Sequence, residues 1–150
     1  MEFLLYLTPV GNQIMDAIAK SKFKVYENIQ LCKVEPNTFG YIDHNKDRFI
    51  VCTNNIKNGG WSLKHYVNET VYHEAVHVAQ DCKNSGLFSF FGPMPLGIPK
   101  QSMPLTASRK DALEDSTSYG GFGLEEREHE AYYLEDKPST VLKYVKKYCL

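Results

Sequence analysis

The chain has 150 residues, a formal net charge of −1, 43% hydrophobic residues and 23% charged residues. This length predicts one domain over residues 1–150, because it is too short for two domains that each bury a sizeable core. The near-zero charge gives no reason to expect nucleic acid or an anionic membrane as a partner.

The apolar run MEFLLYL opens the chain, with Glu2 where a signal peptide would carry positive charge. It is too short to span a bilayer, so we expect a short buried strand and a cytoplasmic protein. Thr8 and Pro9 then form a typical helix start. The apolar residues that follow predict a helix near residues 9–20.

The next segment, YENIQLCKVEPNTFGYIDHNKDRFIVCTN, has the composition of strands joined by turns. We predict strands over 29–34, 38–42 and 48–53, with DHNKD as the turn between the last two. His44 lies in this turn and is expected to be a solvated loop residue.

A long helix is predicted after the glycine pair at 59–60. Ser62 can cap it, and apolar residues then recur at helical spacing to about Lys83. A helix that is apolar over most of its girth belongs in a core. His65, early on this helix, is expected to be a surface or packing residue.

Residues 84–123 are rich in Gly, Pro and Ser and predict a long loop or lid. One short helix is expected within it, at SRKDALEDS. The apolar segment 86–99 either covers a cleft, packs against the core, or blocks the site in a resting form. Two helices, over 124–136 and 139–149, are predicted to complete an α+β fold.

The four cysteines form no C-x-x-C pair. Free and mostly buried thiols are therefore expected in a reducing compartment. Because their number is even, two disulfides are the alternative in an exported protein.

The most specific pattern is VYHEAVHVAQ, which places His73 and His77 four residues apart with Glu74 beside the first. Residues at i and i+4 share one helix face, so both imidazoles can reach one ion. Glu74 projects beside the ion, where it can take a proton from a metal-bound water. A hydrogen-bonded core histidine is the usual alternative, but a buried unpaired carboxylate beside it is costly. The pattern therefore predicts a zinc site, with Gln80 as a supporting or a boundary residue.

A catalytic zinc site needs a third protein ligand and an open fourth position. The only histidine after His77 is His129, but the helix LEEREHEAYYLED is rich in acidic residues. At 100° per residue, Glu128 shares a side with the apolar residues of this helix. Glu128 is therefore the predicted ligand and Glu130 the second choice, with a solvated acidic face as the alternative.

His73-Glu74-Ala75-Val76-His77, followed by a distant Glu128 and Ala131, resembles the gluzincin branch of zincin metallopeptidases, above all its small bacterial and phage members. The resemblance implies a small, mostly antiparallel sheet packed on the motif helix, with a C-terminal helical part. It implies an edge strand that binds peptide by strand addition. It also implies Zn²⁺ held by His73, His77 and Glu128. Relatives carry an acidic residue where this chain has Tyr132, and Glu135 or Asp136 is the expected substitute.

These observations predict a zinc metallopeptidase that acts on peptides or proteins, with Glu74 as general base. Tyr132 and Tyr133 are the candidates for stabilising the oxyanion. One alternative is a deformylase-like metal hydrolase with Cys52 as third ligand, although FIVCTNN lacks the glycine-flanked context of that group. The other is a non-catalytic, zinc-stabilised binding protein, which would need a fourth protein ligand.

Overall fold

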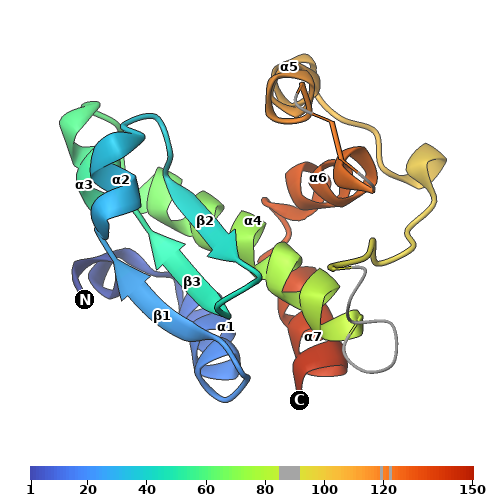
Figure 1. The fold of residues 1–150 in the computed structure, drawn as a ribbon, viewed down its shortest axis with the longest axis horizontal. Helices are drawn as coiled ribbons and strands as arrows, with labels where there is room; N and C mark the ends of the chain where they lie inside the picture. The colour runs from blue at the N-terminus through green and yellow to red at the C-terminus, as the bar shows by residue number, and fades with distance from the viewer. Residues whose placement is uncertain (85–91, 119, 122) are drawn as a thin grey trace.

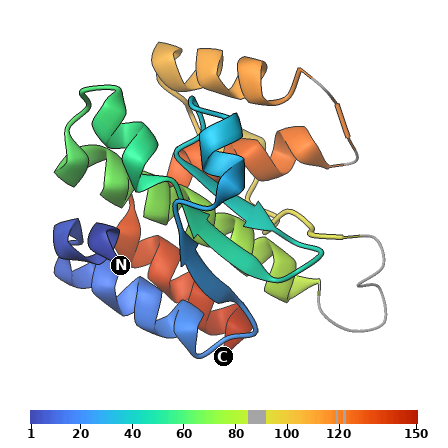
Figure 2. The same ribbon diagram turned by 60° about the vertical axis from the view of Figure 1, so that its left-hand side comes forward.

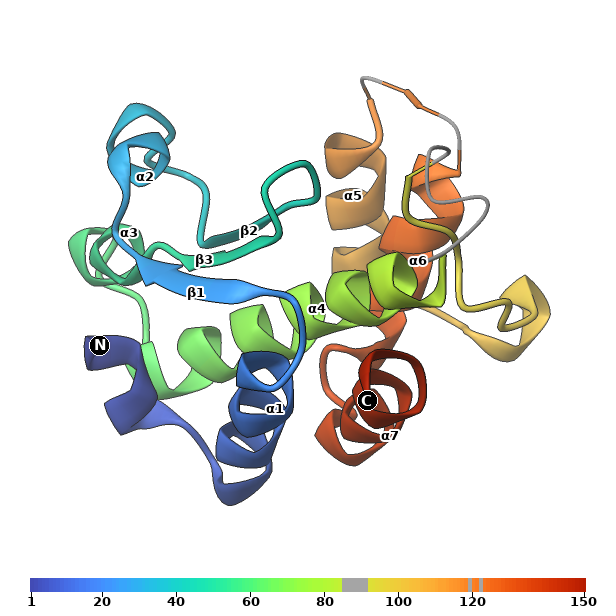
Figure 3. The ribbon, with the colours of Figure 1, turned by 60° about the horizontal axis from the view of Figure 1, so that its bottom comes forward.

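The computed structural model describes residues 1–84, 92–118, 120–121 and 123–150. They form an α+β fold built around the long helix α4 (Leu63–Lys83). In Figure 3 the sheet and helix α6 (Leu124–Leu134) lie above α4, and helices α1 (Pro9–Ala19) and α7 (Pro138–Cys149) lie below it. The helix that carries the histidine pair is therefore at the centre of the fold (Figure 1).

The sheet has three strands, β1 (Lys24–Glu27), β2 (Gly40–Asp43) and β3 (Arg48–Val51), in the order β1-β3-β2. β2 pairs with β3 antiparallel, whereas β1 pairs with β3 parallel. The sheet is therefore mixed, and the prediction of a mostly antiparallel sheet is wrong. The predicted strands 38–42 and 48–53 correspond to β2 and β3.

The predicted strand over 29–34 is wrong, because this segment forms the short helix α2 (Gln30–Val34). The strand lies earlier, at β1, and the chain turns at Asn28, whose φ is +53°. Few residues other than glycine adopt this left-handed conformation, and it interrupts the extended chain. The apolar residues indicated a buried segment, but the prediction placed its strand several residues too late in the chain.

The chain begins with a 3₁₀ helix, η1 (Glu2–Tyr6), instead of the predicted strand. The Glu27 carboxylate accepts hydrogen bonds from the backbone N–H groups of Glu2 at 2.9 Å and Phe3 at 2.8 Å. Phe3 is fully buried, whereas Leu5 is exposed. Since Phe3 and Leu5 would share a face of a strand, this burial is incompatible with one.

The predicted helices are confirmed within a few residues, since their local signals are strong. The Thr8 hydroxyl accepts from the N–H of Gly11 at 3.0 Å and caps α1. The Ser62 hydroxyl accepts from the N–H of His65 at 3.3 Å and caps α4. The short helix expected in the long loop is α5 (Ala107–Ser116). Among the described residues, the further short elements are α2, α3 (Thr53–Asn58) and the 3₁₀ helix η3 (Lys100–Ser102).

The main core lies between α4, α1, α7 and the inner face of the sheet. Figure 2 shows α1 and α7 side by side, and both contact α4. Fully buried apolar residues from these elements include Ile14, Ile18, Phe49, Val51, Val67, Val71, Val141 and Val145. Among the described residues, no helix is both long enough and apolar enough to cross a membrane.

All four cysteines are paired, which makes the expectation of free thiols wrong. Cys32 of α2 is bonded to Cys52, directly after β3, and Cys82 of α4 is bonded to Cys149 of α7. The two pairs are 20 and 67 residues apart in sequence. Only the folding of the chain brings them together, so their spacing gave no sign of the pairing.

Candidate metal centre

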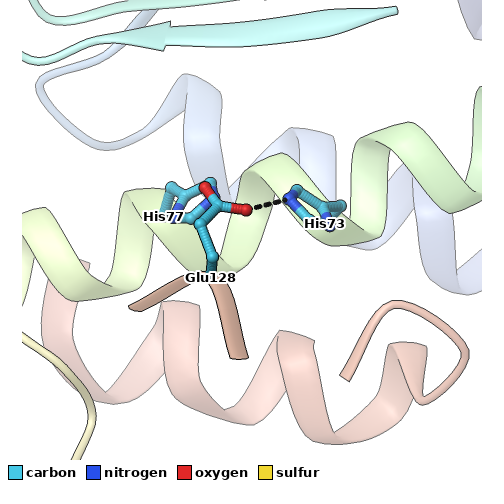
Figure 4. Close-up of side chains that lie close together, drawn as sticks. All are labelled: His73, His77 and Glu128. Atoms are coloured by element: carbon cyan, nitrogen blue, oxygen red, sulfur yellow. Dashed lines mark hydrogen bonds and ion pairs between the residues drawn. The ribbon is translucent and has the colours of Figure 1, made fainter. Parts of the chain in front are cut away.

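His73, His77 and Glu128 meet between α4 and α6 (Figure 4). Nε2 of His73 lies 3.2 Å from Oε2 of Glu128, and Nε2 of His77 lies 2.9 Å from Oε1. One potential ligand atom from each residue lies within 4.8 Å of the other two. The structure therefore brings together the three residues that the sequence predicted as metal ligands.

The other ring nitrogen of His73 is held by a carboxylate. Nδ1 of His73 lies 2.9 Å from Oε2 of Glu135, and Arg109 donates from Nε to the second Glu135 oxygen at 2.9 Å. The sequence left open whether Glu135 or Asp136 replaces the acidic residue that relatives carry at position 132. Glu135 is the one that contacts His73. Arg109 comes from α5 and was not anticipated, because nothing local to α5 signals this contact.

Gln80 holds the other ring nitrogen of His77. Nδ1 of His77 lies 2.8 Å from Oε1 of Gln80. The Gln80 amide donates from Nε2 to the carbonyl of Arg127 at 3.0 Å and to Oε1 of Glu130 at 2.8 Å. Since both of these partners accept, Oε1 must face His77 and the histidine must carry a proton on Nδ1. Gln80 is thus a supporting residue of the cluster and not merely a polar boundary.

Glu130, the second choice for a ligand, lies in a different environment. Its side chain is almost completely buried. Besides Gln80, it accepts the backbone N–H groups of Leu96 at 2.7 Å, Gly97 at 2.9 Å and Ile98 at 3.3 Å. Glu130 therefore fastens residues 96–98 to α6. This contact agrees with the packed alternative for that part of segment 86–99, whose residues 86–91 lie outside the described chain.

Glu74 is buried and lies on the wall of a cleft of about 640 Å³ that also exposes the three clustered side chains. α4, α6 and the segment at and before β2 enclose this cleft. A Cβ atom added at Gly40 would lie 2.5 Å from Cγ2 of Thr70 and 2.9 Å from Cγ of Glu74. Because real Cβ atoms do not approach so closely, glycine at this position allows β2 to pass directly beside Glu74.

The charges of the cluster stabilise one another. Burial by itself lowers the pKa of His73, but hydrogen bonds to Glu128 and Glu135 raise it well above its ordinary value. Burial likewise opposes protonation of His77, and the Glu128 carboxylate raises its pKa. Burial raises the pKa of Glu128, but His77 and His73 together hold it well below its usual range. A divalent cation that binds here would take the place of the imidazole protons.

Tyr132 lies in the cleft, and Tyr133 is not among the residues that line it. The Tyr132 ring packs edge-on against His73 with ring centroids 4.6 Å apart. Tyr133 instead contacts the ammonium group of Lys137, 4.0 Å above its ring.

His44 lies in the predicted turn between β2 and β3, but it is only partly exposed and is not merely a solvated residue. Nδ1 of His44 lies 2.6 Å from Oδ2 of Asp81, and the ring lines the cleft. The signal for this contact is absent from the sequence because the partners are 37 residues apart. His65 is exposed, as predicted. His129 is buried with Nε2 2.8 Å from the carbonyl of Met103 and lies outside the cluster.

Cys52, the ligand of the deformylase-like alternative, is bonded to Cys32 and has no free thiol. Neither a search of the curated proteins nor one of the solved structures gave a match. The family described as "Domain of unknown function (DUF8637)" matches residues 3–150, nearly the whole chain. This chain therefore belongs to the DUF8637 family.

Proposed function

We propose that the protein is a zinc-dependent metallopeptidase, in which His73, His77 and Glu128 hold Zn²⁺ and Glu74 is the general base. The observation that carries this proposal is the convergence of the two Nε2 atoms and the Glu128 carboxylate on one point at the wall of a cleft. Two imidazoles and one carboxylate are a frequent ligand set of catalytic zinc.

The hydrogen bonds around the cluster fit this metal. Gln80 requires a proton on Nδ1 of His77, and the Glu135 carboxylate accepts one from Nδ1 of His73. Both histidines can then offer the lone pair of Nε2 to a cation. Partners of this kind fix the orientation and the tautomer of metal-binding histidines in zinc enzymes. Three protein ligands leave a fourth, open position, which a hydrolytic site requires.

Bound zinc would supply the Lewis acid that activates a water and polarises the scissile carbonyl. Glu74 would accept the proton of that water and pass it to the leaving amine. Burial raises the pKa of Glu74, which brings this carboxylate closer to the pH range in which a general base is most effective. Gly40 keeps β2 against this side chain and so limits the space into which it can turn.

A peptide is the substrate that the cleft suits best. β2 is an edge strand, and the N–H of Cys52 donates to the carbonyl of Phe39 at 2.8 Å. Because hydrogen-bonding direction alternates along an antiparallel pair, the backbone groups of Gly40 and Ile42 point away from β3. Gly40 and Ile42 also line the cleft, so an extended peptide can add to this edge beside the metal ligands. This arrangement of an edge strand above a motif helix supports a zincin-like fold.

The first test is a Glu74→Gln variant, compared with wild type for zinc content and for hydrolysis of a peptide library. We expect one zinc per chain in both proteins. The rate of peptide hydrolysis should be roughly 100-fold or more lower in the variant, because this is the usual contribution of a general base. Full activity of Glu74→Gln would contradict its role.

Wild-type protein that binds zinc and cleaves no peptide would instead favour a zinc-stabilised binding protein. In that case, removal of the zinc by a chelator should lower the thermal midpoint strongly, since a structural site contributes directly to folding. His65→Ala is a suitable control for the measurements of zinc content and hydrolysis. His65 is exposed and lies outside the cluster, so this variant should behave as wild type.

A further inference from the structure

His44 and Asp81 form a pair beside the candidate metal centre. Asp81 follows His77 by four residues, as His77 follows His73, so it continues the same face of α4 about 6 Å further along the helix. His44 reaches Asp81 from the turn between β2 and β3. The pair thus joins the end of the edge strand to the helix that carries the histidine motif.

The Asp81 carboxylate is well placed to hold the His44 ring. Its side chain is 9% exposed, and its two oxygens lie 2.6 Å from Nδ1 of His44 and 2.6 Å from Nζ of Lys22. Burial alone would raise the pKa of Asp81, but the bonds to His44 and Lys22 outweigh it and lower that pKa. The ionised Asp81 carboxylate accepts a hydrogen bond from Nδ1–H of His44. Nε2 is therefore the ring nitrogen that remains for a ligand.

The ring of His44 lines the same cleft as Glu74 and His77. Tyr132, the tyrosine candidate that also lines the cleft, instead packs its ring edge-on against His73. His44 therefore presents an oriented ring, with Nε2 left for a ligand, in the cleft that Glu74 also lines.

We propose that His44, oriented by Asp81, is a catalytic residue that hydrogen-bonds the substrate's carbonyl oxygen while negative charge develops on it. This inference rests on the proposed peptidase function. Removal of one such donor from an enzyme typically lowers kcat about 100- to 1,000-fold.

The first step is the addition of water to the scissile carbonyl. The water oxygen bonds to the carbonyl carbon, the C=O π pair moves to the carbonyl oxygen, and Glu74 takes the proton of the water. In the imidazolium form, with Asp81 as counter-ion, His44 donates from Nε2–H to that oxygen and loses no proton. When a lone pair of that oxygen re-forms the C=O bond, the C–N bond breaks and its electron pair goes to nitrogen, which receives the proton from Glu74.

Two substitutions separate catalysis from folding. In His44→Asn, the amide nitrogen takes the position of Nδ1 and can still donate to Asp81, but the Nε2 donor is absent. In His44→Gln, the amide nitrogen reaches the position of Nε2 instead. We expect His44→Asn to keep the thermal midpoint and zinc content of wild type while kcat falls about 100-fold or more with little change in KM. His44→Gln should recover part of that loss, and His65→Ala should match wild type.

A second readout needs no substrate. Acetohydroxamate, a small zinc ligand with a negatively charged oxygen, is titrated into zinc-loaded protein while the ring nitrogens of His44 are followed by ¹⁵N NMR. Binding should shift the Nε2 signal, and His44→Asn should bind the probe at least about tenfold more weakly than His65→Ala does. An unmoved Nε2 signal, or equal affinity and equal kcat in the two variants, would overturn the role of His44 alone. Wild-type protein that binds no zinc would overturn the proposed function, and this inference with it.

Discussion

Glu128 and Glu130 are two residues apart on α6 and lie in different environments. Glu128 faces the two imidazoles, and Glu130 is surrounded by N–H donors from Gln80 and from Leu96 and its neighbours. Residues at i and i+2 do not share a helix face, so one helix can present one carboxylate to a metal and the other to a loop. At this scale, the direction of a side chain decides its role.

Substitution of these two carboxylates should have different consequences for zinc binding. Glu128→Gln should lower zinc affinity by at least about tenfold, because it removes a ligand, and should also destabilise the zinc-free protein, because it breaks the ion pairs to His73 and His77. Glu130→Gln should keep zinc affinity but destabilise the fold by about 2–3 kcal/mol, since several charge-assisted hydrogen bonds are weakened. Zinc titration and urea unfolding of both variants test this prediction. A larger loss of zinc affinity in Glu130→Gln than in Glu128→Gln would make Glu130, and not Glu128, the third ligand.

At the scale of elements, the start of the chain is fastened to β1 by a single carboxylate. Glu27 accepts the N–H groups at the start of η1 and also the Thr53 hydroxyl, at 2.6 Å, from the start of α3. Burial alone would raise the pKa of Glu27, but the bonds from Thr53, Phe3 and Glu2 outweigh it and lower that pKa. Three elements that are separate in sequence therefore depend on the ionised form of one side chain.

The pH dependence of stability should show this contribution. Because the pKa of Glu27 is lowered in the folded protein, its stabilisation is fully present above the unfolded value of about 4.3 and is lost as the pH falls through the folded value. The difference in thermal midpoint between wild type and Glu27→Gln should thus be largest at neutral pH and shrink below about pH 4. Glu126→Gln, on the exposed face of α6, is the control. A difference that stays constant with pH would contradict the argument.

At the scale of the whole molecule, α4 connects every layer. It contacts the sheet, α1, α6 and α7, and its last turn is bonded through Cys82 to Cys149 at the end of α7. The candidate metal ligands of α4 are therefore placed by a helix held on all sides, and α6 brings the third candidate ligand to a fixed surface. A rigid support of this kind keeps a catalytic site at its working geometry.

The two disulfides should contribute unequally. In the chain-entropy description, closing the 67-residue separation stabilises the fold by about 4 kcal/mol, and closing the 20-residue separation by about 3 kcal/mol. Replacing Cys82 and Cys149 by alanine should thus lower the free energy of unfolding more than replacing Cys32 and Cys52. Urea unfolding of the two double variants under non-reducing conditions tests the order, and a reversed order would show that packing, not loop closure, dominates.

Much of the centre could be predicted from the sequence because it is local. Helix caps at Thr8 and Ser62, the four-residue spacing of His73 and His77, and the facing of Glu128 all depend on helical geometry within a few residues. These signals placed α1 and α4 and singled out the three residues that the fold brings together. Their roles as ligands stay predictions until zinc is measured.

The tertiary structure decided what depends on residues far apart in sequence. The bond of His44 to Asp81, the choice of Glu135 over Asp136, the pairing of the cysteines and the parallel pairing of β1 all arise this way. A local pattern cannot specify such contacts, because each is selected by the packing of whole elements. The sequence by itself determined a helix with two candidate metal-binding side chains, and only the fold determined what surrounds them.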